Sequence, residues 1–247
     1  MKKITNKQSN KKDFNIVLLS SFDSQILPHF LKELYSQDLM AEAIILDGIV
    51  NEKNRKIVSD RTEGFFEWPN FFDIEEYHIP VYFVKNHNGE RCENLLKKIK
   101  PDVIVNAGTP RIIKENILAI PKRGLVNCHP GLLPEYKGCT VVEWAIYNND
   151  PLGATCHFMD KGIDSGPIIC SEVMPIAKGD IYEKVRTDMI FHGVKVMVEG
   201  LKKIRDENIH LNSLPSQKEG NYYKVIPEDK LKEVKNRLVK GLYKHYS

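Results

Sequence analysis

The sequence is poor in features that mark several large classes of protein. It has five cysteines in 247 residues and no Cys-x-x-Cys pair, which argues against structural zinc or a disulfide framework and suits a reducing compartment. No apolar run approaches the roughly 20 residues of a membrane-spanning helix. Its 36 basic and 33 acidic residues leave a net charge of only +3, without the basic excess typical of nucleic-acid-binding proteins. We therefore expect a cytoplasmic protein that binds neither nucleic acid nor a membrane.

Common nucleotide-binding motifs are also absent. Neither G-x-G-x-x-G nor G-x-x-x-x-G-K-[ST] occurs, there is no internal repeat, and no Ser, Cys or Lys stands out as a nucleophile. Residues 1–13 are basic but lack the apolar stretch of a secretory signal, so they are predicted to form a flexible basic tail. The composition, 42% hydrophobic and 28% charged, is that of an ordinary globular protein.

Short apolar runs alternate with amphipathic segments along the chain. Strands are expected at 14–21, 41–48, 79–84, 102–108, 124–127, 153–160 and 166–176, and helices near 27–36, 91–100, 141–150 and 181–204. This order predicts an α/β fold with a doubly wound, mainly parallel, Rossmann-like sheet. We expect one domain over 14–205 and a short extension over 206–247 with a strand and a helix. Residues 51–70 read as a helix or loop, and residues 212–220 as a linker.

Polar residues end the predicted strand at 124–127. Asn127 and His129 are separated by one residue, so in an extended chain both side chains lie on one face and Cys128 packs on the other. The carboxyl ends of strands are where open α/β sheets bind ligands. An amide there can stabilise a developing oxyanion, and an imidazole can transfer a proton. On those two residues alone, a hydrogen-bonded loop cap is the simpler interpretation.

A carboxylate that orients the imidazole would complete a reactive set. Asp164 lies in a Gly-flanked turn between two predicted strands and is the first candidate, with Asp160 as the alternative. A site with an amide, an imidazole and a carboxylate, but no nucleophile, fits direct transfer of a group between two bound substrates.

Two stretches resemble the formyltransferases that use N10-formyltetrahydrofolate. They are NCHPGLLPEYKG at 127–138 and GATCHFMDKGIDSGPII at 153–169. The resemblance implies that fold, that formyl donor, no metal, and a catalytic set of Asn127, His129 and Asp164. It also implies that an amine attacks the formyl carbon while Asn127 and protonated His129 stabilise the oxyanion. Asp164 would set the protonation of His129, whose role as acid, base or both stays open.

The resemblance further implies a pterin pocket between two loops. The corresponding residues are Gly108, Thr109, Pro110, Arg111, Ile112 and Ile113 in one loop, and Asp160, Lys161, Gly162 and Ile163 in the other. Arg111 is expected either to meet the folate carboxylates or to lie in solvent. His157 matches a position that is often polar in relatives, and a hydrogen-bonded strand residue is the simpler interpretation.

The acceptor is expected to be an aminodeoxysugar linked to a nucleotide. Relatives that act on glycinamide ribonucleotide carry a Gly-Ser-Asn phosphate loop where this chain reads SSFDSQILPHF, without glycine. Relatives that act on methionyl-tRNA carry a further C-terminal barrel, whereas only residues 206–247 follow here. By resemblance the best guess is dTDP-4-amino-4,6-dideoxyglucose, formylated for surface polysaccharide such as O-antigen.

Candidate substrate-binding residues are Lys137, Tyr136, Tyr222 and Tyr223. The last two have an alternative role, which is to pack the C-terminal strand onto the domain or onto the partner of an expected homodimer. Other functions stay open: a phosphoribosylglycinamide or methionyl-tRNA formyltransferase, a hydrolase that releases formate, and a folate-binding regulatory module without catalysis.

Overall fold

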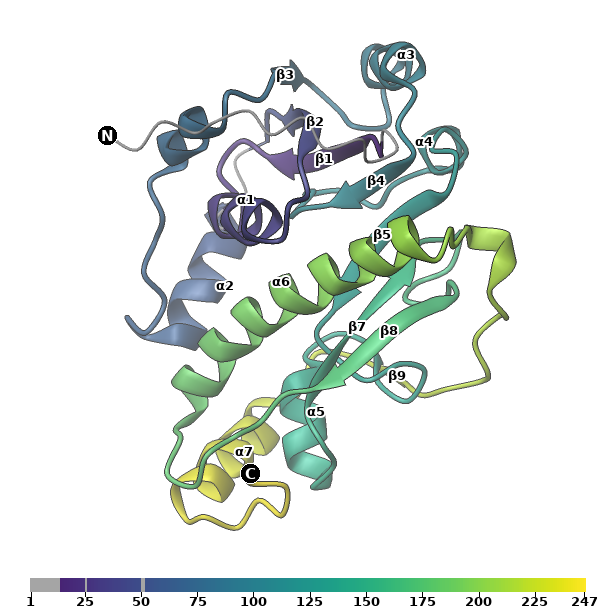
Figure 1. The fold of residues 1–247 in the computed structure, drawn as a ribbon. Coiled ribbons are helices and arrows are strands. Elements are labelled where there is room, and N and C mark those ends of the chain that lie inside the picture. The colour runs from purple at the N-terminus through teal and green to yellow at the C-terminus, as the bar shows by residue number, and fades with distance from the viewer. Residues whose placement is uncertain (1–13, 25, 50–51) are drawn as a thin grey trace.

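A seven-stranded sheet runs through the protein (Figure 1). The computed structural model describes residues 14–24, 26–49 and 52–247, so the predicted tail at 1–13 lies outside the described residues. The strand order is β3-β2-β1-β4-β5-β7-β8. The first five strands in this order pair in parallel, while β5 with β7 and β7 with β8 pair antiparallel. The predicted α/β fold with a mainly parallel sheet is confirmed.

The elements follow the expected alternation. The strands of the sheet are β1 (Ile16–Ser21), β2 (Ala41–Asp47), β3 (Val81–Val84), β4 (Val103–Asn106), β5 (Gly124–His129), β7 (Gly153–Phe158) and β8 (Ile168–Val173). The α-helices are α1 (Leu27–Ser36), α2 (Glu52–Thr62), α3 (Glu90–Ile99), α4 (Glu115–Leu118), α5 (Val141–Asn148), α6 (Tyr182–Asp206) and α7 (Glu228–Val239). Short 3-10 helices cover Phe71–Tyr77 and Leu211–Ser213. The stretch at 51–70, which the sequence left open, thus contains α2.

Two apolar cores lie on opposite faces of the sheet. Residues of α1, α5 and α6 pack on one face, and residues of α3 and α4 pack on the other. The β1 strand reads IVLLSS and is buried along its whole length, as expected for a central strand covered on both faces. In Figure 1, α1 and α6 lie together across one face of the sheet. No helix in the described part of the chain is long and apolar enough to cross a membrane.

The β5 strand extends beyond the predicted 124–127 and reaches His129. Pairing with β7 explains the difference, because Cys128 faces Cys156 and His129 faces Thr155 across the two strands. A second, small sheet joins β6 (Lys137–Gly138) to β9 (Tyr222–Tyr223) in parallel. The C-terminal segment therefore returns to the loop that follows the end of β5.

Candidate active site

His129, at the end of β5, meets Asp164 from the turn between β7 and β8. The Nδ1 atom of His129 lies 3.4 Å from Oδ2 of Asp164. The same carboxylate oxygen accepts a hydrogen bond of 3.0 Å from the backbone N–H of Gly138. Asp160 instead caps its own turn, accepting from the backbone N–H of Gly162 and the hydroxyl of Ser165. Of the two candidate carboxylates, Asp164 is the one that contacts the imidazole.

The imidazole of His129 is buried between two hydrogen-bond acceptors. Its Nε2 donates to the carbonyl of Tyr136 at 2.7 Å, and its Nδ1 faces Asp164. Burial lowers the pKa of His129 below its usual value, while the Asp164 carboxylate and the Tyr136 carbonyl oppose this shift. Near neutral pH the ring is therefore mainly neutral, with Nδ1 free to take a proton that Asp164 then stabilises.

The amide of Asn127 is held in one orientation by two neighbours. Its Oδ1 accepts from Nδ2 of Asn106 at 2.9 Å, and its Nδ2 lies 3.3 Å from Nε2 of His157. The Nδ1 of His157 donates to the carbonyl of Phe158 at 2.8 Å, so the neutral ring presents Nε2 as an acceptor. Asn127 thus uses one N–H toward His157 and keeps the other as a donor for an oxyanion.

His157 is part of this cluster as well as a hydrogen-bonded strand residue. It is 2% exposed, and its Nε2 lies 3.9 Å from Oδ1 of Asp164. Asn106 and His157 were not predicted as site residues. The sequence held a signal for both residues. Asn106 ends a buried strand next to β5. His157 lies opposite Asn127 once β5 and β7 are paired in antiparallel register.

The loop after β4 is anchored by a buried ion pair. Arg111 donates from Nε to Oδ2 of Asp47 at 2.5 Å and from Nη2 to Oδ1 at 3.2 Å. The Asp47 side chain is fully buried. Burial opposes its ionisation, but hydrogen bonds from Arg111 and from the backbone of His87 and Ile49 outweigh this and lower the pKa of Asp47. Arg111 therefore neither lies free in solvent nor extends away from the loop.

His87 supports the same loop from β3. It is fully buried, and its Nε2 donates to the carbonyl of Ile45 at 3.0 Å. Its Nδ1 accepts from the hydroxyl of Thr109 at 2.7 Å. Burial lowers the pKa of His87, which keeps the ring neutral and this donor–acceptor pattern intact. The backbone at 108–113 is thus held by side chains of β2 and of the segment after β3.

The two loops of the expected pterin pocket leave apolar side chains in solvent. Ile112 is 80% exposed and Ile163 is 55% exposed, whereas Ile113 packs in the core. Lys161 forms an ion pair of 2.8 Å with Glu115, the first residue of α4. Exposed isoleucines on loops beside a sheet suit a flat, partly apolar ring such as a pterin. No group of acidic, histidine and cysteine side chains suited to hold a metal occurs among the described residues.

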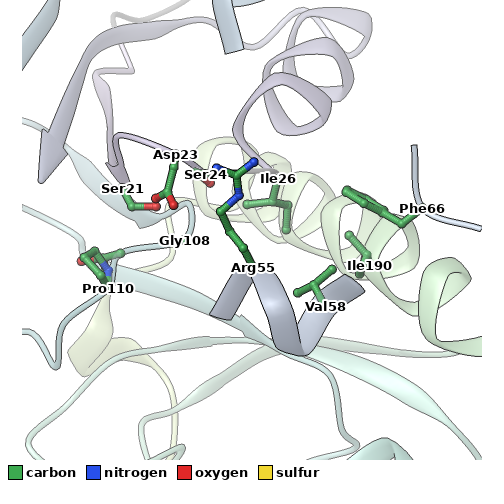
Figure 2. Close-up of a pocket in the computed structure, with 11 residues that line it drawn as sticks. Ser21, Asp23, Ser24, Ile26, Arg55, Val58, Phe66, Gly108, Pro110 and Ile190 are labelled. Carbon is green, nitrogen blue, oxygen red and sulfur yellow. The ribbon is translucent and has the colours of Figure 1, made fainter. Parts of the chain in front are cut away.

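A pocket of about 380 Å³ opens beside this loop, large enough for a small molecule. Figure 2 shows Ser21 at the end of β1 and Asp23 and Ser24 just after it, with Gly108 and Pro110 of the loop after β4 nearby. Gly108 and Pro110, together with Thr109, are thus predicted cofactor residues that line this pocket. Gly108 and Thr109 are held by Asn106, the last residue of β4, whose Oδ1 accepts from their backbone N–H groups.

The same pocket has a cationic and an apolar wall. In Figure 2 the Arg55 side chain extends from α2 toward Asp23 and Ser24, and Val58 and Ile190 lie below it. Arg55 also lies over the ring of Trp68, with its guanidinium carbon 5.5 Å from the ring centre. A neighbouring apolar pocket shares Ile26 and Ile190 with it and is bordered by Asn106, Cys128 and Pro130. Together they form a path from solvent to the end of β5.

The predicted substrate-binding residues separate into two kinds. Tyr136 is 5% exposed, bonds Asp150 through its hydroxyl, and stacks on Tyr223 with ring centres 5.1 Å apart. The Tyr136 and Tyr223 rings therefore pack the C-terminal strand onto the domain. Tyr222 is 55% exposed and covers Gly138, and Lys137 is half-buried on the same short strand pair. Lys137 and Tyr222 lie next to Gly138, whose backbone N–H donates to Asp164.

The arrangement of these residues agrees with a family match. A model of the formyl transferase family, described as "Formyl transferase", matches residues 14–201. The chain belongs to this family. A curated relative, methionyl-tRNA formyltransferase of Kosmotoga olearia, is 32% identical over 155 residues, which are 62% of this chain and 50% of the relative. The chain spans about half the length of the curated relatives it matches.

Solved structures share the fold at lower identity. Phosphoribosylglycinamide formyltransferase of Anaplasma phagocytophilum aligns with a TM-score of 0.63 at 20% identity, over 86% of this chain and 100% of that one. A sugar N-formyltransferase of Shewanella sp. FDAARGOS_354 aligns with a TM-score of 0.59 at 19% identity, over 86% and 77%. At these identities the likeness concerns the fold, which formyltransferases with different acceptors share.

Proposed function

We propose that this protein transfers a formyl group from N10-formyltetrahydrofolate to the amino group of a nucleotide-linked aminodeoxysugar. The contact between His129 and Asp164 beside the oriented amide of Asn127 carries the proposal. This contact brings a hydrogen-bond donor for an oxyanion and a proton acceptor together at the end of one strand, in a chain that belongs to the formyl transferase family.

Each residue of the set has a distinct task in formyl transfer. Bound N10-formyltetrahydrofolate would supply the formyl group. The free N–H of Asn127 would donate to the carbonyl oxygen as that oxygen gains negative charge. Nδ1 of His129 would receive the proton that the amine loses, and Oδ2 of Asp164, 3.4 Å away, would stabilise the imidazolium. The loops at 108–113 and 160–163 would hold the donor.

The wall of this pocket that carries Arg55 suits an anionic acceptor, while Gly108, Thr109 and Pro110 on another wall belong to the loop that would hold the donor. A guanidinium next to serine hydroxyls suits a phosphate or diphosphate, while the apolar wall of Val58 and Ile190 suits a deoxysugar or a base. The loop after β1 reads SSFDS, without the glycine that would bring backbone N–H groups onto a ribonucleotide phosphate. By family resemblance we favour a dTDP-linked 4-amino-4,6-dideoxysugar, made for surface polysaccharide.

The proposal is tested by an acceptor panel. Purified protein and N10-formyltetrahydrofolate are incubated with dTDP-, UDP- and GDP-linked aminosugars, glycinamide ribonucleotide and methionyl-tRNA, and the release of tetrahydrofolate is measured. Turnover with an aminosugar nucleotide is expected. If only glycinamide ribonucleotide or only methionyl-tRNA were formylated, that molecule would be the acceptor and the aminosugar proposal would be wrong. Turnover of His129→Ala at the wild-type rate, with the fold intact, would show that the assigned site is wrong.

A further inference from the structure

The turn that carries Asp164 adopts a backbone conformation that other groups must hold. Asp164 has φ of +51°, in the left-handed region that residues other than glycine seldom occupy. Its side chain is only 14% exposed. Residues kept in such conformations persist where the surrounding structure supports them. The position of the carboxylate against His129 therefore depends on what binds this turn.

Gln217, from the segment after α6, binds the turn directly. Its Nε2 donates to the carbonyl of Asp164 at 3.1 Å and to the carbonyl of Gly166 at 2.6 Å. One amide nitrogen thus uses its two hydrogens to bridge two carbonyls of the turn. The Oε1 atom of Gln217 is buried and has no hydrogen-bond partner in the described part of the chain. Gln217 therefore stabilises the turn through the two N–H donors of its amide.

The turn also packs closely against the end of β7 at Gly166. A Cβ atom on Gly166 would come within 2.0 Å of the carbonyl oxygen of Phe158, at the end of β7. The backbone of the turn therefore packs tightly against that strand end. Gln217 bonds two carbonyls of the same turn, so both the sheet and the C-terminal segment hold the turn.

The same segment also holds the group that binds the carboxylate. The carbonyl of Asn221, just before β9, accepts from the backbone N–H of Lys137 at 3.0 Å, and the carbonyl of Tyr223 accepts from that of Cys139 at 2.8 Å. The intervening N–H of Gly138 donates instead to Oδ2 of Asp164 at 3.0 Å.

This segment lies mostly exposed, yet it meets the domain closely at Gln217 and Gly220, although the sequence reads as a linker. Figure 1 shows the chain leaving the end of α6 and returning toward the strands at β9. A Cβ atom on Gly220 would come within 1.9 Å of the Pro134 carbonyl. We infer that Gln217 is a positioning residue for formyl transfer, which fixes the Asp164 turn and thereby the carboxylate against His129. The inference rests on the proposed function, because it assigns no other reaction.

The test compares Gln217→Leu with a neighbouring control. Leucine keeps the bulk of the side chain and removes both donors. We expect kcat for formyl transfer to fall about 10- to 100-fold, as for a misplaced catalytic group. We also expect the Gly138 N–H to exchange with solvent at least about tenfold faster, because its acceptor moves. Glu219→Gln changes an exposed side chain in the same segment and is expected to match wild type in both measurements.

Two further variants make the outcome decisive. Asp164→Ala shows how much activity is lost when the carboxylate is absent, since it removes the acceptor of the Gly138 N–H and the partner of His129. If Asp164→Ala loses turnover while Gln217→Leu keeps wild-type kcat and Gly138 protection, the inference is overturned and the proposed function stands. If Asp164→Ala turns over at the wild-type rate, the catalytic role of Asp164 is wrong and the inference fails with it, whereas the proposed function itself fails only if no acceptor of the panel is formylated. If Gln217→Leu does not fold, Gln217→Asn, whose shorter amide cannot reach both carbonyls, is expected to show the same two losses.

Discussion

Asn127 and His157 face each other across β5 and β7, with Nδ2 of Asn127 3.3 Å from Nε2 of His157. The histidine presents Nε2 as an acceptor because its Nδ1 donates to the Phe158 carbonyl. Burial lowers the pKa of His157, against the Phe158 carbonyl and the Asp164 carboxylate, so the ring stays neutral near pH 7. His157 therefore decides which way the Asn127 amide points.

His157→Phe is expected to lower kcat about 10- to 100-fold, because the amide of Asn127 loses the acceptor that orients its donor. Steady-state formyl transfer at saturating substrates measures the effect. His192→Phe is a matched control, since His192 is also buried and bonded to a carbonyl, that of Glu172, away from the cluster. Wild-type kcat in His157→Phe would show that Asn127 is oriented by Asn106 alone.

Arg55→Met is expected to raise the KM for the acceptor about tenfold and to leave the KM for the folate near wild type. The guanidinium lies in the pocket assigned to the acceptor, where it would pair with phosphate. Lys56→Met is the control, because Lys56 is exposed on the same helix and pairs with Asp60 at 3.2 Å. An increase confined to the folate KM would place the donor in this pocket instead.

Arg111→Met is expected to lower the free energy of unfolding by about 3 kcal/mol, because it leaves the buried Asp47 carboxylate without its cation. Arg111→Lys should lose less, since it keeps the charge but not the two parallel hydrogen bonds. Urea denaturation measures both. Arg91→Met, an exposed position on α3, serves as control and should stay within about 0.5 kcal/mol of wild type. Equal stability of Arg111→Met and Arg91→Met would contradict the structural role.

Acid is expected to destabilise the protein below pH 6.5. Burial lowers the pKa of His29, His87, His129 and His157 from the usual 6.5. As pH falls through 6.5, the unfolded chain gains protons that the folded protein does not bind. The free energy of unfolding should therefore decrease, by up to about 1.4 kcal/mol per pH unit for each of the buried His87, His129 and His157, and by less for the partly exposed His29. The contribution of these histidines to the free energy of unfolding is fully present above pH 6.5 and is lost as the pH falls toward their lowered pKa values in the folded protein.

The His87 contribution is separable. His87 is fully buried and bonded to Thr109 and Ile45, and His87→Gln removes its titration. Urea denaturation at pH 7.5, 6.5 and 5.5 should give a smaller acid decrease for His87→Gln than for wild type. Parallel curves would mean that His87 is protonated equally in both states.

Much of the architecture was readable because it depends on local patterns. Short apolar runs such as IVLLSS, bounded by polar segments, are typical of buried strands, and amphipathic segments between them are typical of helices that cover a sheet. The spacing of Asn127 and His129 predicted a shared face because an extended chain alternates its side chains. The segment at 212–220 was read as a linker, because nothing in its composition reveals that Gln217 bonds the turn at 164–166.

The sequence by itself determined the α/β fold, the resemblance to the formyltransferases and the three candidate catalytic residues, because strand periodicity and compact motifs are local properties. Only the tertiary structure decided which groups meet. It placed His157 opposite Asn127, paired Arg111 with Asp47, and brought Gln217 back to the Asp164 turn. These contacts join distant segments through register and loop path, which are set by the packing of the whole chain.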